Sequence, residues 1–181
     1  MSLPSLQSND FELFGLPLRF AQERPAIDAR WKELQREAHP DKFAAQGASA
    51  QRIAMQWSVR INEAYQRLKD PLKRAAYLCE LNGAAVNAEN NTAMPADFLM
   101  QQMQWRESLE EASSLADVYE ITSELSASKL VLLQQCEVLL DQAHDYSAAV
   151  AQVRALMFLD RFASDVERRL DALESQFSRL L

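Results

Sequence analysis

The stretch best equipped for chemistry is His39-Pro40-Asp41-Lys42, which brings an imidazole, a carboxylate and an ammonium group together. A neighbouring histidine and aspartate are the residue types of an acid-base pair, since histidine titrates near neutral pH. A carboxylate presented on a turn is equally suited to accept a charge-assisted, bidentate hydrogen bond from an arginine of another protein. The tripeptide alone is also typical of a solvated loop, with the histidine placed favourably at a helix C-terminus. The surrounding sequence has to separate these interpretations.

Neither catalysis nor metal binding gains further support from the sequence. No nucleophile, oxyanion hole or Gly-rich phosphate loop accompanies His39 and Asp41, and the only other histidine is His144. The two cysteines, Cys79 and Cys136, lie far apart on helical apolar stripes, where buried thiols are the simplest expectation. Such dispersed residues cannot supply the ligand spacing of a zinc or iron-sulfur site. We therefore expect no enzymatic activity, no metal and no cofactor.

Composition favours an all-α, acidic protein. Of the 181 residues, 48% are hydrophobic, and only 3 glycines and 6 prolines interrupt them, so long helices around a sizeable core are expected. The net charge of −7 argues against a nucleic-acid partner, which would need an excess of lysine and arginine. Residues 1–90 hold 12 Lys and Arg against 11 Asp and Glu, whereas residues 91–181 hold 7 against 15. Halves of such different charge favour different partners.

The start of the chain carries no targeting pattern. No basic stretch is followed by an apolar core, no segment approaches membrane-spanning length, and the first charges are Asp10 and Glu12, with no basic residue before Arg19. We therefore expect no membrane partner and a bacterial-type cytoplasmic location.

The first half is expected to form an antiparallel helical hairpin with the His39 turn at its tip. A short helix over 10–14, capped by Asn9, should cover one side. The first long helix should begin near Pro25 and end before Pro40, with Lys32 and Arg36 together on its outward face. Two apolar stripes at helical spacing define the hairpin: Ile27, Trp31, Leu34 and Ala38, then Ile53, Trp57, Ile61, Ala64, Tyr65 and Leu68.

The second half is expected to form a separate bundle of three helices. Before it, the first half should close with a further helix from Asp70-Pro71 to Leu81 that ends at Asn82-Gly83, and residues 84–94 are the best candidate linker to the bundle. Short connections near Ser113-Ser114 and His144-Asp145 would make neighbouring helices antiparallel. The expected inward stripes are Phe98, Trp105, Leu109 and Ala112; Val118, Ile121, Leu125, Leu132, Leu139 and Ala143; and Leu159, Ala163, Val166, Leu170, Leu173 and Phe177.

In this order of elements, residues 9 to 82 resemble a J-domain, the module by which co-chaperones engage DnaK-type ATPases. A short aromatic helix, a basic-faced helix, the tripeptide and a long helix precede the run from Asp70 to Tyr77. The resemblance implies that His39, Pro40 and Asp41 dock on the chaperone and stimulate its ATP hydrolysis. Lys32, Arg36 and Lys42 would steer and orient the encounter.

The remaining features are similar to the HscB family, the J-proteins of iron-sulfur cluster assembly. They are the run from Phe11 to Pro17, Lys42-Phe43 after the turn, and an acidic three-helix tail in place of a Gly/Phe region or zinc fingers. The resemblance implies a J-domain over 1–83, a linker over 84–94 and a bundle over 95–181. It also implies an HscA-type chaperone as one partner and the scaffold protein IscU, held by the bundle, as the other.

Hydrophobic residues beyond the main core stripes predict where a protein would bind to the bundle. Leu99, Met100 and Met103 lie beside the first stripe, and Met157 and Phe158 flank the third. A wide core stripe would account for any one of them, but an exposed group rich in Leu, Met and Phe is typical of a binding surface.

The resemblance implies that Leu99, Met100, Met103 and Phe158 contact the scaffold, with Glu107 at an acidic rim. Two positions depart from the family pattern. Gln104 stands where an acidic residue is expected, and Met157 stands where a basic residue often precedes the phenylalanine. These changes leave the hydrophobic centre intact and alter the charge of the rim.

Two other functions fit part of the sequence. A J-protein delivering a different client to a general DnaK-type chaperone would share the first-half features. A helical scaffolding protein with a coincidental tripeptide would share only the fold.

Overall fold

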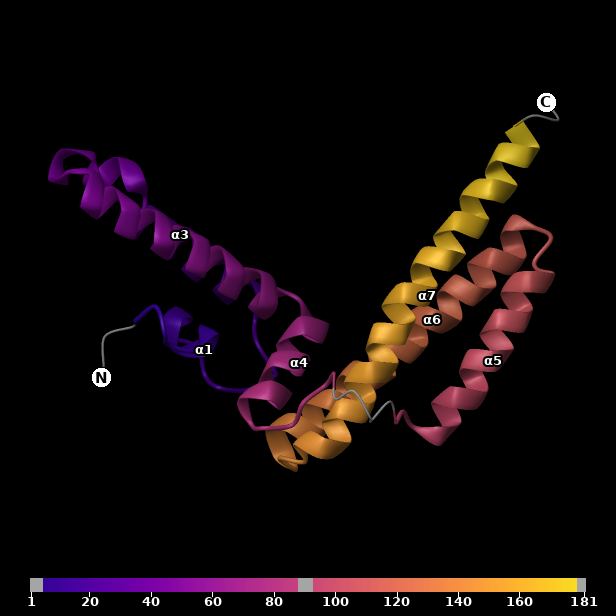
Figure 1. Ribbon diagram of the computed structural model, residues 1–181. Helices are drawn as coiled ribbons and strands as arrows, with labels where there is room; N and C mark the ends of the chain where they lie inside the picture. The colour runs from indigo at the N-terminus through magenta and orange to yellow at the C-terminus, as the bar shows by residue number, and fades with distance from the viewer. Residues whose placement is uncertain (1–4, 88–92, 179–181) are drawn as a thin grey trace. The chain divides into compact units, whose positions relative to one another are not determined.

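The expected all-α fold is confirmed. The computed structural model describes residues 5–87 and 93–178, and in that part of the chain helices and their connections account for all of the structure (Figure 1). Contacts divide the chain into two units, Met1–Leu78 and Cys79–Leu181, so the division falls inside helix α4 (Pro71–Leu81). The linker was predicted at 84–94, and its centre, residues 88–92, lies outside the described residues. The predicted domain limits stay a prediction.

The first unit contains the helical hairpin. Its elements are α1 (Asp10–Phe14), α2 (Arg24–Glu37), the 3-10 helix η1 (Pro40–Gln46), α3 (Ala48–Lys69) and the start of α4. As predicted, Asn9 caps α1, and Glu12 completes a reciprocal capping box with it. Gly15 ends that helix with a left-handed φ of 62°, a conformation that glycine adopts without steric cost.

The apolar faces of α2 and α3 meet as the stripes predict, but not along their whole length. Ile27, Leu34 and Ile61 are buried, whereas Ile53 is 52% exposed. Near its N-terminus α3 packs with η1, and Ile53 lines an open pocket there of about 550 Å³ together with Phe43. The predicted stripe was therefore wrong at Ile53, because at this end a short turn replaces the facing helix.

A set of hydrogen bonds joins α2 to α3 near the tip of the hairpin. The side-chain oxygen of Asn62 accepts from Trp31 Nε1 at 2.9 Å and from Gln35 Nε2 at 2.7 Å. Ser58 donates its hydroxyl to the carbonyl of Ala38 at 3.1 Å, just before the turn. These bonds satisfy polar groups at the helix interface and the C-terminal end of α2, so they fix where the turn begins.

A buried carboxylate anchors α1 to α3. Asp10 is fully buried and accepts two hydrogen bonds from Arg67, with its Oδ1 2.9 Å from Arg67 Nη2. Arg60 Nη1 lies 2.8 Å from Asp10 Oδ1 as an ion pair without hydrogen-bond geometry. The Asp10 N–H donates to the hydroxyl of Tyr77 in α4 at 3.1 Å. Hydrogen bonding to Asp10 raises the pKa of Arg67, and desolvation raises the pKa of Tyr77.

The second unit contains the predicted bundle of three helices. These are α5 (Ala96–Glu111), α6 (Leu115–Glu137), which continues as the π-helical turn η2 (Val138–Gln142), and α7 (Tyr146–Ser178). Figure 1 shows α6 and α7 running side by side with α5 alongside them. Ser114 and Asp117 form a capping box at the start of α6, and Asp145 accepts from the Ala148 N–H at the start of α7.

The end of the α6 stripe differs from the prediction. Leu132, Cys136 and Leu140 are buried, whereas Leu139 is only half-buried and Ala143 is exposed. The π-helical turn holds an extra residue per turn and rotates the chain relative to an ideal helix, so spacing counted at 3.6 residues no longer finds the inner face. The side chain of Phe177, predicted for the third stripe, lies outside the described residues.

The third helix is also longer than its predicted stripe. It begins at Tyr146, and its early turns bury Val153 and Leu156. Arg154, only 8% exposed, donates from Nε to the Val86 carbonyl at 3.0 Å and from Nη1 to the Ala93 carbonyl at 3.3 Å. An arginine inside the second unit thus holds two segments that precede the bundle, a role that periodicity did not predict.

We predict that Asp10→Asn destabilises the first unit by about 3 kcal/mol, because Arg60 and Arg67 then lack the carboxylate that offsets their partial burial. Urea unfolding followed by helical circular dichroism measures the change. The control is Asp28→Asn, which removes the charge of an exposed pair with Arg24 while the amide oxygen can still accept from the Tyr65 hydroxyl, and it should cost much less than Asp10→Asn. Equal effects of the two substitutions would contradict a special role for Asp10.

Candidate functional site

The His39 turn is built by the end of one helix and the start of another. Helix α2 ends at Glu37, and the Ala38 N–H closes its last turn on Leu34. His39 has extended backbone, with φ −63° and ψ 124°, as the following Pro40 requires. The His39 carbonyl accepts the Lys42 N–H at 3.0 Å, so the chain turns at once into η1. The turn has its own hydrogen bonds and is not an unstructured loop.

The two chemical groups of the turn are exposed. The side chain of His39 is 57% exposed and that of Asp41 is 90% exposed. His39 Nδ1 accepts the Asp41 N–H at 3.3 Å, so in the neutral ring the proton sits on Nε2. Nδ1 lies 3.6 Å from Asp41 Oδ2, which is too long for a hydrogen bond. Among the described residues no donor hydrogen-bonds the Asp41 oxygens, and both remain available to a partner.

This geometry suits binding better than acid-base catalysis. Catalytic acid-base pairs usually lie in pockets that exclude water and have a low dielectric constant. The side chains of His39 and Asp41 are instead exposed to solvent. The pocket beside η1 is lined by Phe43, Ile53 and other residues of the hairpin, but neither His39 nor Asp41 lines it.

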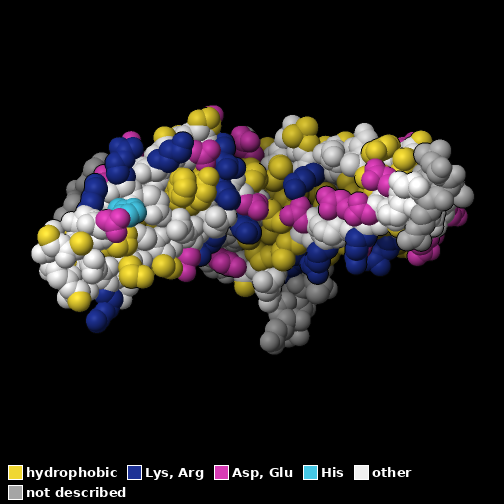
Figure 2. All heavy atoms as spheres, turned by 90° about the horizontal axis from the view of Figure 1, so that it is seen from above, with side chains coloured by type: hydrophobic (Ala, Val, Ile, Leu, Met, Phe, Trp, Pro, Cys, Tyr) yellow, Lys and Arg dark blue, Asp and Glu magenta, His cyan; other side chains and the backbone are white. Residues whose placement is uncertain are grey.

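A basic surface accompanies the turn. Lys32 and Arg36 are exposed one helical turn apart on α2, and Lys42 is exposed on η1. Figure 2 shows an imidazole beside an acidic side chain on the surface, with several Lys and Arg side chains on the same part of the molecule. The arrangement places positive charge around a solvated carboxylate, which gives a partner both attraction and a defined register.

A second exposed surface lies on α5. Leu99, Met100 and Met103 are 47%, 69% and 66% exposed, and we call these three side chains the α5 patch. Such exposure of unbranched or flexible apolar side chains on one helix face is typical of a protein-binding surface. Gln104 and Glu107, predicted for its rim, are also exposed.

Phe158 does not belong to the exposed surface, contrary to the prediction. It is 9% exposed, meets Phe98 edge-on at 5.7 Å between ring centroids and stacks on Phe162 at 5.6 Å. The guanidinium of Arg106 lies 5.5 Å from its ring centre. Met157 beside it is half-buried. Phe158 is a core residue that supports α5 through Phe98, because four aromatic side chains, Trp105 included, fill the space between α5 and α7.

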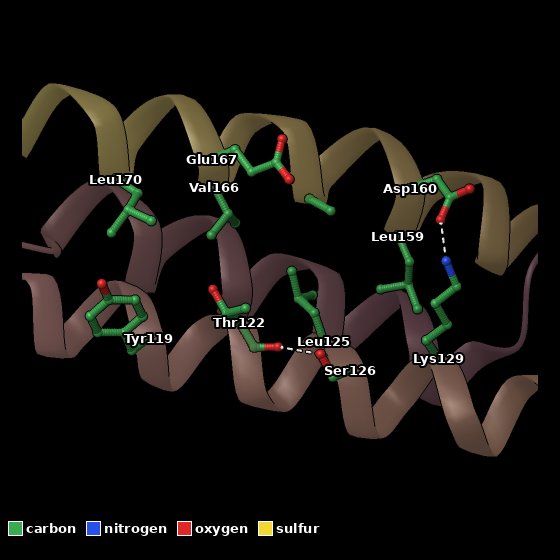
Figure 3. Close-up of a pocket in the computed structure, with 11 residues that line it drawn as sticks. Tyr119, Thr122, Leu125, Ser126, Lys129, Leu159, Asp160, Val166, Glu167 and Leu170 are labelled. Atoms are coloured by element: carbon green, nitrogen blue, oxygen red, sulfur yellow. Dashed lines mark hydrogen bonds and ion pairs between the residues drawn. The ribbon is translucent and has the colours of Figure 1, made fainter.

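Three hollows lie beside α6, and one of them is lined by Val131, Gln134 and Val138 of its outer side together with Gln152 of α7. The other two lie between α6 and its neighbouring helices. One, between α5 and α6, is lined by Gln104, Glu107 and Glu124 among others, and Glu124 accepts a hydrogen bond from Trp105 Nε1 at 2.8 Å. The other, of about 390 Å³ between α6 and α7, has an apolar floor and an ion pair of 2.8 Å between Lys129 and Asp160 at its edge (Figure 3). Neither brings together the groups of a catalytic site.

The two cysteines lie within electrostatic range of each other in the second unit, whereas the two histidines belong to different units. Cys79 and Cys136 are buried, and desolvation raises the pKa of their thiols to about 11 and about 12. Metal binding requires thiolate, so these thiols are poor ligands. In residues 5–87 and 93–178, no cluster of three or more His, Cys, Asp or Glu could hold a metal ion. Within the same ranges, no helix is long and apolar enough to span a membrane.

Comparison with known proteins places these features in a family. The family model described as the HSCB C-terminal oligomerisation domain matches residues 94–167. The co-chaperone protein HscB homolog of Burkholderia multivorans is 48% identical over 174 residues, which cover 94% of this chain and 99% of the relative. The homolog of Burkholderia thailandensis is 47% identical over 173 residues, with 94% of this chain and 98% of the relative covered.

Solved structures agree. Chaperone HscB from Vibrio cholerae superposes with a TM-score of 0.78 at 36% identity, covering 92% of this chain and 99% of the other. Human co-chaperone HscB has the same fold, with a TM-score of 0.84 at 24% identity over 93% of this chain and 85% of the other. With a helical hairpin that exposes its His-Pro-Asp turn, a three-helix bundle, and relatives matched over nearly their whole length, the chain belongs to the HscB co-chaperone family.

Proposed function

We propose that the first unit stimulates ATP hydrolysis by an HscA-type chaperone of the DnaK family, through direct docking of the His39 turn. The observation that carries the proposal is the Asp41 carboxylate, exposed at the hairpin tip without a hydrogen-bond donor among the described residues. A partner arginine can then form a bidentate bond without first displacing an internal partner. Binding should cost little conformational entropy in the turn, because hydrogen bonds of the Asp41 and Lys42 N–H groups to His39 already order it.

The basic residues contribute orientation. Lys32, Arg36 and Lys42 attract an acidic surface of the chaperone and raise the rate of encounter more than the final affinity. The hydrogen bonds of Asn62 keep α2 at a fixed position on α3, so the basic face and the carboxylate reach the chaperone in one geometry.

The second unit would hold the scaffold protein IscU on the α5 patch and deliver it to the chaperone, in a bacterial cytoplasm. Leu99, Met100 and Met103 supply the apolar centre of this contact, and Glu107 supplies a carboxylate at its edge. The chain would then act as an adaptor with two separate sites, while ATP hydrolysis and cluster chemistry take place on its partners.

A general J-protein with another client is the alternative. ATPase assays with HscA and with DnaK, each with and without IscU, separate the two functions. Synergy of the chain with IscU on HscA supports the proposal. Equal stimulation of DnaK with no effect of IscU would favour the alternative, and no stimulation of either chaperone would exclude both.

We also infer that the second unit associates with another copy of the chain. The description of the matching family model as an oligomerisation domain supports this role, since the match spans α5, α6 and much of α7.

We predict that Asp41→Asn lowers ATPase stimulation by at least about tenfold, because it removes one partner of a charge-assisted pair. Helical content and scaffold binding should not change, since the side chain is 90% exposed. The matched control is Asp171→Asn, an exposed aspartate of α7. A large fall in the unfolding temperature of Asp41→Asn would assign Asp41 a structural role instead.

We predict that Leu99→Ala combined with Met103→Ala weakens IscU binding by roughly tenfold or more, through lost apolar contact area. Titration calorimetry measures the affinity. The matched control is Met55→Ala with Val59→Ala, which truncates side chains of similar exposure, 59% and 57%, on α3. An unchanged affinity of the α5 variant would remove the α5 patch from the binding surface.

We predict that Phe158→Ala mainly destabilises the fold and lowers the free energy of unfolding by about 3–5 kcal/mol, as expected for truncation of a buried aromatic side chain. The unfolding free energy of the full chain in urea tests this. A loss under about 1 kcal/mol combined with a large loss of IscU binding would show that Phe158 is a surface contact after all.

A further inference from the structure

Helix α6 carries an exposed apolar face that neither proposed partner uses. Leu130, Val131 and Val138 are 59%, 51% and 48% exposed. With the exposed Ala127 and Gln134 they recur every three or four residues, so they lie on one side of the helix. We call these five residues the α6 stripe.

The α6 stripe is uncharged although the second half of the chain is strongly acidic. Between Ser123 and Val138 the charged residues of α6 are Glu124, Lys129 and Glu137. Glu124 accepts a hydrogen bond from Trp105 of α5, and Lys129 forms an ion pair with Asp160 of α7. Both charged side chains therefore lie at the sides of α6, toward the neighbouring helices. Glu137 flanks the stripe. The outward line from Ser123 to Val138, about 22 Å long, therefore presents only small, apolar and amide side chains.

We propose that the α6 stripe is the surface through which two copies of this chain associate, with their α6 helices antiparallel about a two-fold axis near Val131. This assignment rests on the self-association proposed above and names its contact surface. A two-fold axis brings the same patch of each copy together, so the patch has to complement itself.

The order of side chains along α6 supports this pairing. With the axis near Leu130 and Val131, Ser123 of one copy faces Val138 of the other, and Ala127 faces Gln134. Small residues thus oppose larger ones, as close packing of two helices requires, and no charge meets a like charge along the centre. A strongly charged partner would find no counter-charge on this stripe, which favours a second copy over such a protein.

The contact is expected to be weak and to strengthen with salt. A single pair of helices buries less than the roughly 1,200 Å² of a stable standard interface, so the dissociation constant should be on the order of 100 μM. Both copies carry a net charge of −7, and added salt screens their repulsion while leaving the apolar contact intact.

Sedimentation velocity of the full chain, below and above this concentration, tests the inference. Val131→Glu should weaken association at least about tenfold, because it places two carboxylates at the axis. Circular dichroism should show no loss of helix. Two controls insert the same charge elsewhere: Met55→Glu on α3 and Met100→Glu in the α5 patch, both highly exposed. Neither should alter association.

Symmetric cross-linking provides a second readout. Val131→Cys should give a disulfide-linked dimer under mild oxidation, and Met55→Cys should not, while the native Cys79 and Cys136 are buried. A wild-type chain that stays monomeric at every concentration would overturn both self-association and this surface. Association that survives Val131→Glu but is lost with Met100→Glu would overturn the α6 stripe alone. ATPase stimulation tests the chaperone proposal independently of either result.

Discussion

The carboxylate of Asp10 is the interaction on which the first unit depends most. It is fully buried and binds Arg67 and Arg60 of α3, while its backbone N–H reaches Tyr77 of α4. Burying a charge is costly unless it is paired and hydrogen-bonded, so α1 fits in only one way. The apolar residues of α1 follow it into the core, and the hairpin gains a rigid base.

From this base, the polar groups of the hairpin serve opposite purposes. Near the base, the carboxylate of Asp10 is buried and paired with arginines, so it cannot contact another protein. At the tip, Asp41 is 90% exposed and lacks a donor among the described residues. No group of the first unit offsets the cost of desolvating Asp41, which fits the proposed role of this carboxylate in binding a partner arginine. Asn62 and Ser58 connect the two ends by holding α2 on α3 up to the turn.

The second unit separates packing from recognition by helix face. The rings of Phe98, Phe158 and Phe162 fill the space between α5 and α7, and this support leaves the α5 patch facing outward. The α6 stripe is a second outward face with a different character, since it lacks the carboxylate that Glu107 adds near the α5 patch. Under the proposed functions, two such faces would let one bundle bind a client and another copy of the chain at the same time.

The sequence by itself determined the main helices, the cap at Asn9, the connection at Ser113-Ser114 and the His39 turn, because each depends on local spacing and backbone preferences. Only the tertiary structure decided which side chains are buried at the ends and edges of the predicted stripes. Periodicity placed Ile53 in a core stripe and Phe158 beside one, yet Ile53 lies open beside η1 and Phe158 is enclosed by two other rings. The same holds for the π-helical turn after Glu137 and for the burial of Asp10 and Arg154. These features depend on residues distant in the chain, and helical spacing carries no information about such contacts.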